Sequence, residues 1–178
     1  TENSKPLTFN ISMAKKILIG LVAILVIIQF FRPAKNISEE MSATDISFHY
    51  AIPDDVDLIL KEACNDCHTN NTKYPFYSNI QPVAWFLDHH VTDGKRRLNF
   101  TTFTSMKIAR QNHAFEDIVT TVKEHEMPLP SYTWLGLHSG ANLSDEQREV
   151  VIKWAEAQMD SLKATYPADS LILRRPPG

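Results

Sequence analysis

Both cysteines of this 178-residue chain lie in one short segment, Cys64-Asn65-Asp66-Cys67-His68, which has the pattern C-x-x-C-H. This pattern is typical of the attachment site of a c-type haem. The two thiols form thioether bonds to the haem vinyl groups, and the histidine that follows is held where its imidazole can bind the iron. We therefore predict one covalent haem c, with Cys64 and Cys67 as the attachment residues and His68 as the proximal iron ligand.

Two other chemistries also use a C-x-x-C pair. A structural zinc site needs two more closely spaced ligands, and a thioredoxin-like redox pair belongs to a βαβ context. The sequence shows neither feature around Cys64 and Cys67. Haem attachment also uses His68, so we prefer it and keep zinc binding and thiol redox chemistry as alternatives.

Composition limits the class of protein and its partners. With 43% hydrophobic residues the chain can bury a core, and its length suits one domain with a tail or an anchor. Its 18 basic and 21 acidic residues give a net charge of -3, and several of the basic residues lie near the two ends. The middle is therefore more acidic than the total, which argues against nucleic acid as a partner. We expect redox partner proteins, which the sequence does not identify.

Residues 17–31 are almost wholly apolar, with Lys15 and Lys16 before them and Arg32 after them. At about 1.5 Å per residue this run covers roughly 22 Å, short of the roughly 30 Å hydrocarbon core and near the upper limit of a signal-peptide core. We favour an uncleaved anchor, because no small-x-small cleavage site follows and the basic flanks can snorkel. The positive-inside rule keeps Lys15 and Lys16 in the cytoplasm. We therefore expect a single-pass protein of the cytoplasmic (inner) membrane, with its C-terminal domain in the periplasm.

Composition divides the chain into five segments. Met13 opens Met-Ala-Lys-Lys, which is typical of a translation start, so the residues before it are either a start-site artefact or a short cytoplasmic tail. The segments are a polar N-terminal extension (1–12), a membrane anchor or signal segment (13–34), a linker (35–52), a haem c-binding domain (53–163) and a C-terminal tail (164–178). Within the tail, the apolar run Leu171-Ile172-Leu173 is the part expected to dock on the domain.

Apolar residues recur at helical spacing within the domain, and no run of alternating residues competes with them. One helix starts after Pro53 and carries the C-x-x-C-H segment, and a second runs from Pro82 to about Gly94. A third covers residues 114–126, and a fourth starts at the capping box of residues 144–147. We predict an all-α, cytochrome c-like monohaem domain with an N-terminal transmembrane anchor helix.

The loop at residues 69–82 is rich in aromatic side chains. A backbone carbonyl near Pro75 or Pro82 is predicted to accept a hydrogen bond from Nδ1 of His68 and so to orient its ring. Several aromatic side chains are predicted either to cover a haem edge or to fill the core: Tyr74, Phe76 and Tyr77 in this loop, and Tyr132 and Trp134 further on.

The segment from Cys64 to Trp85, followed by residues 87–91 (Leu-Asp-His-His-Val) and 98–100 (Leu-Asn-Phe), resembles the haem-binding domain family. These are small, membrane-anchored, bacterial cytochrome c-like proteins, and the similarity extends from about residue 53 to about residue 159. The resemblance implies a haem cofactor and an exported domain. The sequence departs from the family's pattern at Phe76, Phe86 and Phe103, where tryptophan is expected, and at Leu137-His138-Ser139, where a His-Pro pair is usual.

Met127-Pro128-Leu129-Pro130 follows the third helix and resembles the sixth-ligand loop of class I cytochromes c. The resemblance makes Met127 the predicted distal ligand, since a thioether favours ferrous iron and raises the reduction potential relative to a second histidine. The alternatives are a histidine ligand (His89, His90 or His125), an open sixth position, and a Met127 that only fills a gap in the core. In cytochromes c a terminal helix crosses the first one, and the helix after Ser144 is placed to do the same.

Three functions fit these predictions. The first is transfer of single electrons, in which the protein sets the potential and the access while the haem carries the chemistry. The second is a haem-based sensor or ligand-binding module with an open or displaceable sixth ligand. The third is a peroxidase, which needs an acid/base group beside an open iron, for which His89 and His90 are the candidates. We expect an electron carrier rather than an enzyme and assign no catalytic residue.

Overall fold

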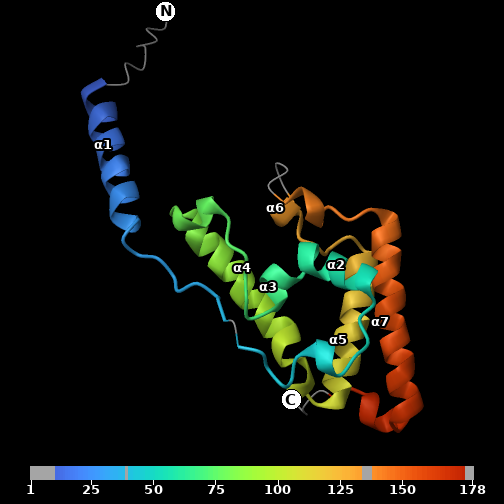
Figure 1. Cartoon of the computed structure of the whole chain (residues 1–178). Helices are drawn as coiled ribbons and strands as arrows, with labels where there is room; N and C mark the ends of the chain where they lie inside the picture. The colour runs from blue at the N-terminus through green and yellow to red at the C-terminus, as the bar shows by residue number, and fades with distance from the viewer. Residues whose placement is uncertain (1–10, 39, 134–137, 175–178) are drawn as a thin grey trace, which may run out of the picture. The chain divides into compact units, whose positions relative to one another are not determined.

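The computed structural model describes residues 11–38, 40–133 and 138–174. Within these ranges all regular secondary structure is helical and no strand is present, which confirms the predicted all-α class (Figure 1). The predictions for Trp134 and for residues 1–10 lie outside the described residues.

The chain forms two compact units, which are described one at a time. Unit 1 consists of residues 1–35 and 74–89, and unit 2 consists of residues 36–73 and 90–178.

Helix α1 (Ile11–Ile28) belongs to unit 1 and consists mostly of aliphatic residues. None of the helices formed by the described residues has both the length and the apolarity needed to cross a membrane. Most of the large apolar side chains of α1 are about half exposed or more, namely Met13, Ile17, Leu18, Ile19, Leu21, Val22, Ile24, Leu25, Val26 and Ile27.

Two glutamines join the end of α1 to the segment before helix α4 (Val83–Arg97). Gln29 Nε2 donates to the carbonyl of Gln81 (3.2 Å), and the N–H of Gln81 donates to Gln29 Oε1 (2.9 Å). Gln81 Nε2 also donates to the carbonyl of Phe31 (2.6 Å), and its Oε1 accepts from the N–H of Trp85 in the first turn of α4 (3.3 Å). The Gln81 side chain is buried, and these bonds satisfy groups that would be costly to bury unpaired.

Three long helices form the core of unit 2: α2 (Asp54–Ala63), α5 (Ile108–Lys123) and α7 (Asp145–Thr165). Apolar residues at intervals of three and four give each helix one buried face. Helix α5 lies along α7, and α7 also contacts α2 (Figure 1). The predicted contact between the last helix and the first helix of the domain is therefore confirmed. The core includes Val56, Leu60, Phe100, Phe103, Phe115, Ile118, Val151, Trp154 and Leu162.

The start of α7 is the predicted capping box. Ser144 Oγ accepts from the N–H of Gln147 (3.3 Å), and Gln147 Oε1 accepts from the N–H of Ser144 (2.9 Å). Both bonds satisfy N–H groups that a helix start leaves without partners.

Several helix boundaries differ from the predictions, and α5 begins at Ile108, six residues before its predicted start. Helix α2 ends at Ala63 and Cys64 has φ of -123°, so His68 lies on a separate short helix, α3 (Asn65–His68). Helix α5 ends at Lys123 instead of residue 126, because His125 turns the chain into the left-handed region (φ 59°). Helix α4 continues past Gly94 to Arg97.

Short elements complete unit 2. Ile46, in the segment expected to be a linker, is buried in the core from η1 (Ile46–Phe48). In the tail, Leu171 docks from η6 (Ala168–Leu171), whereas Ile172 and Leu173 stay exposed. The other short helices are η3 (Phe100–Ser105), α6 (Pro130–Thr133) and η5 (Ser139–Ala141) in unit 2, and η2 (Phe76–Asn79) in unit 1.

Candidate functional site

The C-x-x-C-H segment forms the junction of α2 and α3. The N–H groups of Cys67 and His68 both donate to the carbonyl of Cys64, at 3.2 and 3.0 Å. This turn brings both thiols and the imidazole onto one short stretch of backbone. Both cysteines are free and partly buried. Free thiols are the groups that form thioether bonds, so the segment fits covalent haem attachment.

A backbone carbonyl orients His68. Its Nδ1 lies 3.0 Å from the carbonyl oxygen of Leu98, and because a carbonyl only accepts, Nδ1 carries the proton. Nε2 therefore keeps the lone pair that binds a metal. Burial lowers the pKa of His68, against smaller opposing effects of backbone bonds from Leu98 and Gly94. The imidazole is thus neutral at neutral pH, the form that binds iron.

The predicted orienting carbonyl, near Pro75 or Pro82, is wrong. Leu98 is 30 residues from His68 and comes next to it because α4 continues beyond the glycine that was taken as its end. The ring of Phe100 lies near the ring of His68, with 6.1 Å between the two centroids. The sequence offered one indication of this contact, because residues 98–100 form part of the resemblance to the haem-binding domain family.

At Gly94 the backbone of α4 closely approaches the second cysteine of the motif. A Cβ atom at this position would lie 2.7 Å from the carbonyl oxygen and 3.1 Å from Cβ of Cys67. Such distances are shorter than atoms tolerate, and a backbone oxygen cannot swing away as a flexible side chain can. Glycine is therefore required inside this helix for the helix to contact the second cysteine.

The environment of the thiols distinguishes between the alternatives. Burial raises the pKa of Cys64 to about 12, with a further contribution from Cys67. Burial also raises the pKa of Cys67 to about 11, with a further contribution from Asp66. A thioredoxin-like pair works through a thiol whose pKa is lowered, so these sites weigh against thiol redox chemistry. The described residues also contain no group of three or more His, Cys, Asp or Glu side chains that would hold a metal ion such as zinc.

Met127 follows the C-terminus of α5. Its N–H donates to the carbonyl of Thr121 (3.1 Å), and its side chain is partly buried against the core. Arg148 of α7 is buried and donates from Nη1 to the carbonyls of Met127 (2.7 Å) and Val122 (3.1 Å). Sequence reasoning missed Arg148, although it shares the helical face of Val151 and Trp154.

A hydrogen bond joins the motif to the chain that follows Met127. The hydroxyl of Tyr132 in α6 donates to Oδ2 of Asp66, within C-x-x-C-H, at 2.7 Å. The Tyr132 ring also stacks on His138, with 4.0 Å between centroids and 14° between planes. The predicted proximal residues and the predicted distal loop thus belong to one unit and are joined by a side-chain contact.

The three alternative histidine ligands lie in different surroundings. His90 is partly buried, with Nε2 at 3.4 Å from Ser131 Oγ of α6. His125 is exposed in the turn after α5, and His89 is exposed in unit 1. His90 is therefore the alternative that lies beside the segment after Met127.

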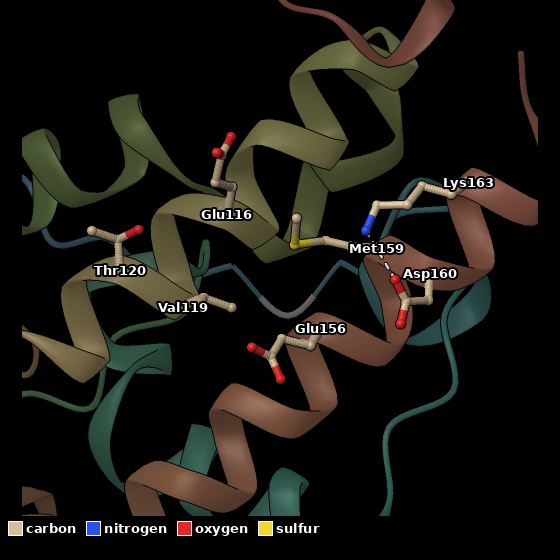
Figure 2. A pocket seen from close by; sticks show the side chains of 7 residues that line it. All are labelled: Glu116, Val119, Thr120, Glu156, Met159, Asp160 and Lys163. Carbon is tan, nitrogen blue, oxygen red and sulfur yellow. Dashed lines mark hydrogen bonds and ion pairs between the residues drawn. The ribbon is translucent and has the colours of Figure 1, made fainter. Parts of the chain in front are cut away.

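A surface pocket of about 340 Å³ opens between α5 and α7, and Figure 2 shows the side chains that line it. Lys163 and Asp160 form an exposed ion pair at its edge (2.9 Å). None of the predicted haem-site residues contributes to its lining, which is Glu116, Val119, Thr120, Glu156, Met159, Asp160 and Lys163. The pocket is separate from the candidate site.

Comparison with known proteins adds three findings. The model of a haem-binding domain family matches residues 23–157. The chain is 25% identical over 104 residues to cytochrome c peroxidase Ccp of Escherichia coli (strain K12), a region of 57% of this chain and 22% of that protein. The chain thus spans less than a quarter of the length of that curated relative. No solved structure matches the chain.

Proposed function

This chain belongs to the haem-binding domain family, and we propose that it is a membrane-anchored c-type cytochrome that carries one covalent haem and transfers single electrons. The observation that carries the proposal is the orientation of His68. Its Nδ1 bond to the carbonyl of Leu98 leaves Nε2 available, on the same turn of backbone as two free thiols.

Each site residue has one role in this proposal. Cys64 and Cys67 would hold the haem by thioether bonds, and Nε2 of His68 and the sulfur of Met127 would bind its iron. When bound, the haem supplies reversible one-electron iron chemistry. The carbonyl of Leu98 keeps the His68 ring in one orientation and raises its basicity as a ligand. A thioether among the iron ligands would favour the ferrous state and so raise the reduction potential.

We place the protein at the cytoplasmic membrane, with the apolar segment of residues 13–34 as its anchor and the haem domain in the periplasm. The support is the exposure of the aliphatic side chains of α1, together with Lys15 and Lys16 at its N-terminal end. Redox proteins of that compartment are then the partners.

A pair of charges in α1 tests the anchor. The double variant Leu21→Lys with Ile24→Lys costs about 6–8 kcal/mol of insertion free energy if these side chains face lipid. We expect the variant to move from the membrane fraction to the supernatant. Leu58→Lys is the matched control, because Leu58 is 64% exposed on α2 in unit 2 and should leave the protein in the membrane fraction. Equal partition of the two variants would overturn the anchor.

A second candidate function is a ligand-binding haem protein with an open or displaceable sixth position, acting as a sensor or on peroxide. The observation that favours it is the similarity to cytochrome c peroxidase Ccp, which covers more than half of this chain. His90 is the acid/base candidate in this case, because it is partly buried near α6. The two functions differ in one feature, the occupant of the sixth position.

Optical spectra of the protein matured with haem c distinguish electron transfer from ligand binding. With Met127 on the iron, we expect a sulfur-to-iron charge-transfer band at the red edge of the oxidised spectrum and no shift when carbon monoxide is added to the reduced form. Met127→Ala should lose the band and bind carbon monoxide. Met159→Ala is the matched control, because Met159 is also a partly buried methionine packed against the core, and it should keep the wild-type spectrum.

Two other results would overturn electron transfer by a Met127-ligated haem. A high-spin wild-type spectrum that shifts with carbon monoxide would favour the ligand-binding function. A low-spin spectrum that is lost in His90→Ala but kept in Met127→Ala would assign the sixth position to His90.

A further inference from the structure

Asp66 is a fixed hydrogen-bond acceptor inside the C-x-x-C-H segment. Its Oδ1 accepts from the N–H of Lys73 (3.0 Å), and its carbonyl accepts from Oγ1 of Thr72 (2.6 Å). The bond from Lys73 orients the carboxylate, the bond from Thr72 holds the backbone beside it, and Oδ2 accepts from the hydroxyl of Tyr132 (2.7 Å). The two residues between the cysteines have no role in thioether formation, so the contacts of Asp66 need another explanation.

The chain from Met127 to Tyr132 is held at its two ends by different partners. At Met127 the backbone is bonded to Thr121 and Arg148, on the α5–α7 side of unit 2. At Tyr132 the hydroxyl is bonded to Asp66, on the side of the haem-attachment segment. The segment between these two points carries the predicted distal sulfur at its first residue. The position of that sulfur relative to the motif therefore depends on both attachments.

We propose that the hydrogen bond from Tyr132 to Asp66 is a latch that positions Met127 as the sixth ligand and so controls the access of diatomic ligands to the iron. The inference rests on the proposed function and makes Tyr132 a positioning residue, because it acts through Met127. The iron–thioether bond is a weak one, so its occupancy depends on where the protein holds the sulfur. A hydroxyl bonded to a carboxylate is among the stronger side-chain hydrogen bonds, which suits this task.

The latch also connects the haem-attachment segment to the proposed sixth ligand of the iron. Asp66 lies between Cys64 and Cys67, so its carboxylate is carried by the same turn whose thiols would hold the haem. Ligation at the sixth position is thereby coupled through one hydrogen bond to the geometry of covalent attachment. The same bond separates a closed electron carrier from an open ligand-binding site.

Carbon monoxide binding to the reduced holoprotein tests the latch, with Tyr132→Phe as the first variant. Loss of the hydroxyl should keep the sulfur-to-iron band at rest but increase the rate of carbon monoxide binding about tenfold, the effect of one hydrogen bond to a charged acceptor. Tyr50→Phe is the matched control. It also removes a tyrosine hydroxyl bond, from Tyr50 to Gln111 Oε1 (2.6 Å), but at a core site away from the motif, and its rate should equal that of the wild type.

A double variant checks that Tyr132 acts through Asp66. Asp66→Ala should raise the rate at least as much as Tyr132→Phe, and Asp66→Ala with Tyr132→Phe should equal Asp66→Ala alone, because the bond can be lost only once. Additive effects would overturn the latch. A rate in Tyr132→Phe equal to that in Tyr50→Phe, with the charge-transfer band present in the wild type, would also overturn it while leaving Met127 ligation intact. Absence of the band in the wild type would instead overturn the ligand assignment, and the latch with it.

Discussion

The two sides of the candidate haem site are held in different ways. On the proximal side, the carbonyl of Leu98 fixes His68, and the motif packs against Gly94. These contacts are made by backbone atoms in α4 and just after it. On the distal side, the Met127 segment is fixed mainly by two side chains, Arg148 and Tyr132. A substitution cannot remove a backbone carbonyl, but it can remove a guanidinium or a hydroxyl. We therefore expect the proximal side to be disrupted by substitutions that add side-chain atoms, and the distal side by substitutions that remove hydrogen-bonding groups.

The largest effect is expected from an added atom on the proximal side. Gly94→Ala places a Cβ at 2.7 Å from the carbonyl oxygen of Cys67, which must move α4 or the motif. We expect a loss of about 3 kcal/mol in the free energy of unfolding, the upper range for overpacking, and a lower yield of haem attachment. Urea unfolding and the haem-to-protein ratio after maturation measure the two effects.

Gly140→Ala is the matched control for this variant. Its Cβ would lie 2.6 Å from Glu62 Oε2, which is the end of a flexible side chain that can move away. We expect a change within about 0.5 kcal/mol and normal haem attachment. Equal losses in the two alanine variants would contradict the importance of the α4 contact.

The next effect is expected from a deletion on the distal side. Arg148→Met removes the hydrogen bonds to the carbonyls of Val122 and Met127, but it also relieves the burial of Nε, which lacks a partner among the described residues. Hydrogen bonds from a charged donor are worth about 1.5–3 kcal/mol each, so the net loss is about 2 kcal/mol. We also expect a weaker sulfur-to-iron band, which a purely structural loss elsewhere would not cause.

Lys153→Met tests the same exchange of a cation for methionine at an exposed site of α7. Lys153 pairs with Glu149 at 3.2 Å and its side chain is 70% exposed, so the loss should stay below about 1 kcal/mol and the spectrum should not change. An unchanged band in Arg148→Met would show that the guanidinium does not position Met127.

The comparison also explains what the sequence could and could not predict. The C-x-x-C-H motif and the capping box at Ser144 are local patterns. The structure has the capping box as predicted, but it places His68 on a separate short helix instead of on the helix that starts after Pro53. The contacts of His68 with Leu98 and of Asp66 with Tyr132 join residues 30 and 66 positions apart, and no local pattern encodes such pairs. Gly94 was misread because glycine commonly ends helices, whereas here it allows a close helix contact.

A smaller effect with a pH signature is expected at Tyr50. Burial raises the pKa of Tyr50 to about 12, with a further contribution from Tyr166. The unfolded chain releases the proton near pH 10 and the folded chain only near pH 12, so this group's contribution to stability is present below pH 10 and lost as the pH rises between these values. Tyr50→Phe should cost about 1 kcal/mol at pH 8, because Gln111 loses its donor. Urea unfolding at pH 8 and pH 11 should show a smaller gap at the higher pH, and a constant gap would contradict the raised pKa.

The smallest effect is expected at the turn that leads from α5 to Met127, and its sign is opposite. His125 has φ of 59°, a conformation that costs an L-residue about 1–2 kcal/mol, and its side chain is exposed. Glycine avoids that cost but loses more chain entropy on folding, so His125→Gly should stabilise by about 0.5 kcal/mol. His113→Gly, inside α5, should instead destabilise by about the same amount or more. If His125 only shapes the turn, its glycine variant keeps the charge-transfer band and gains stability, whereas loss of the band would show that this turn is needed to place the Met127 sulfur on the iron.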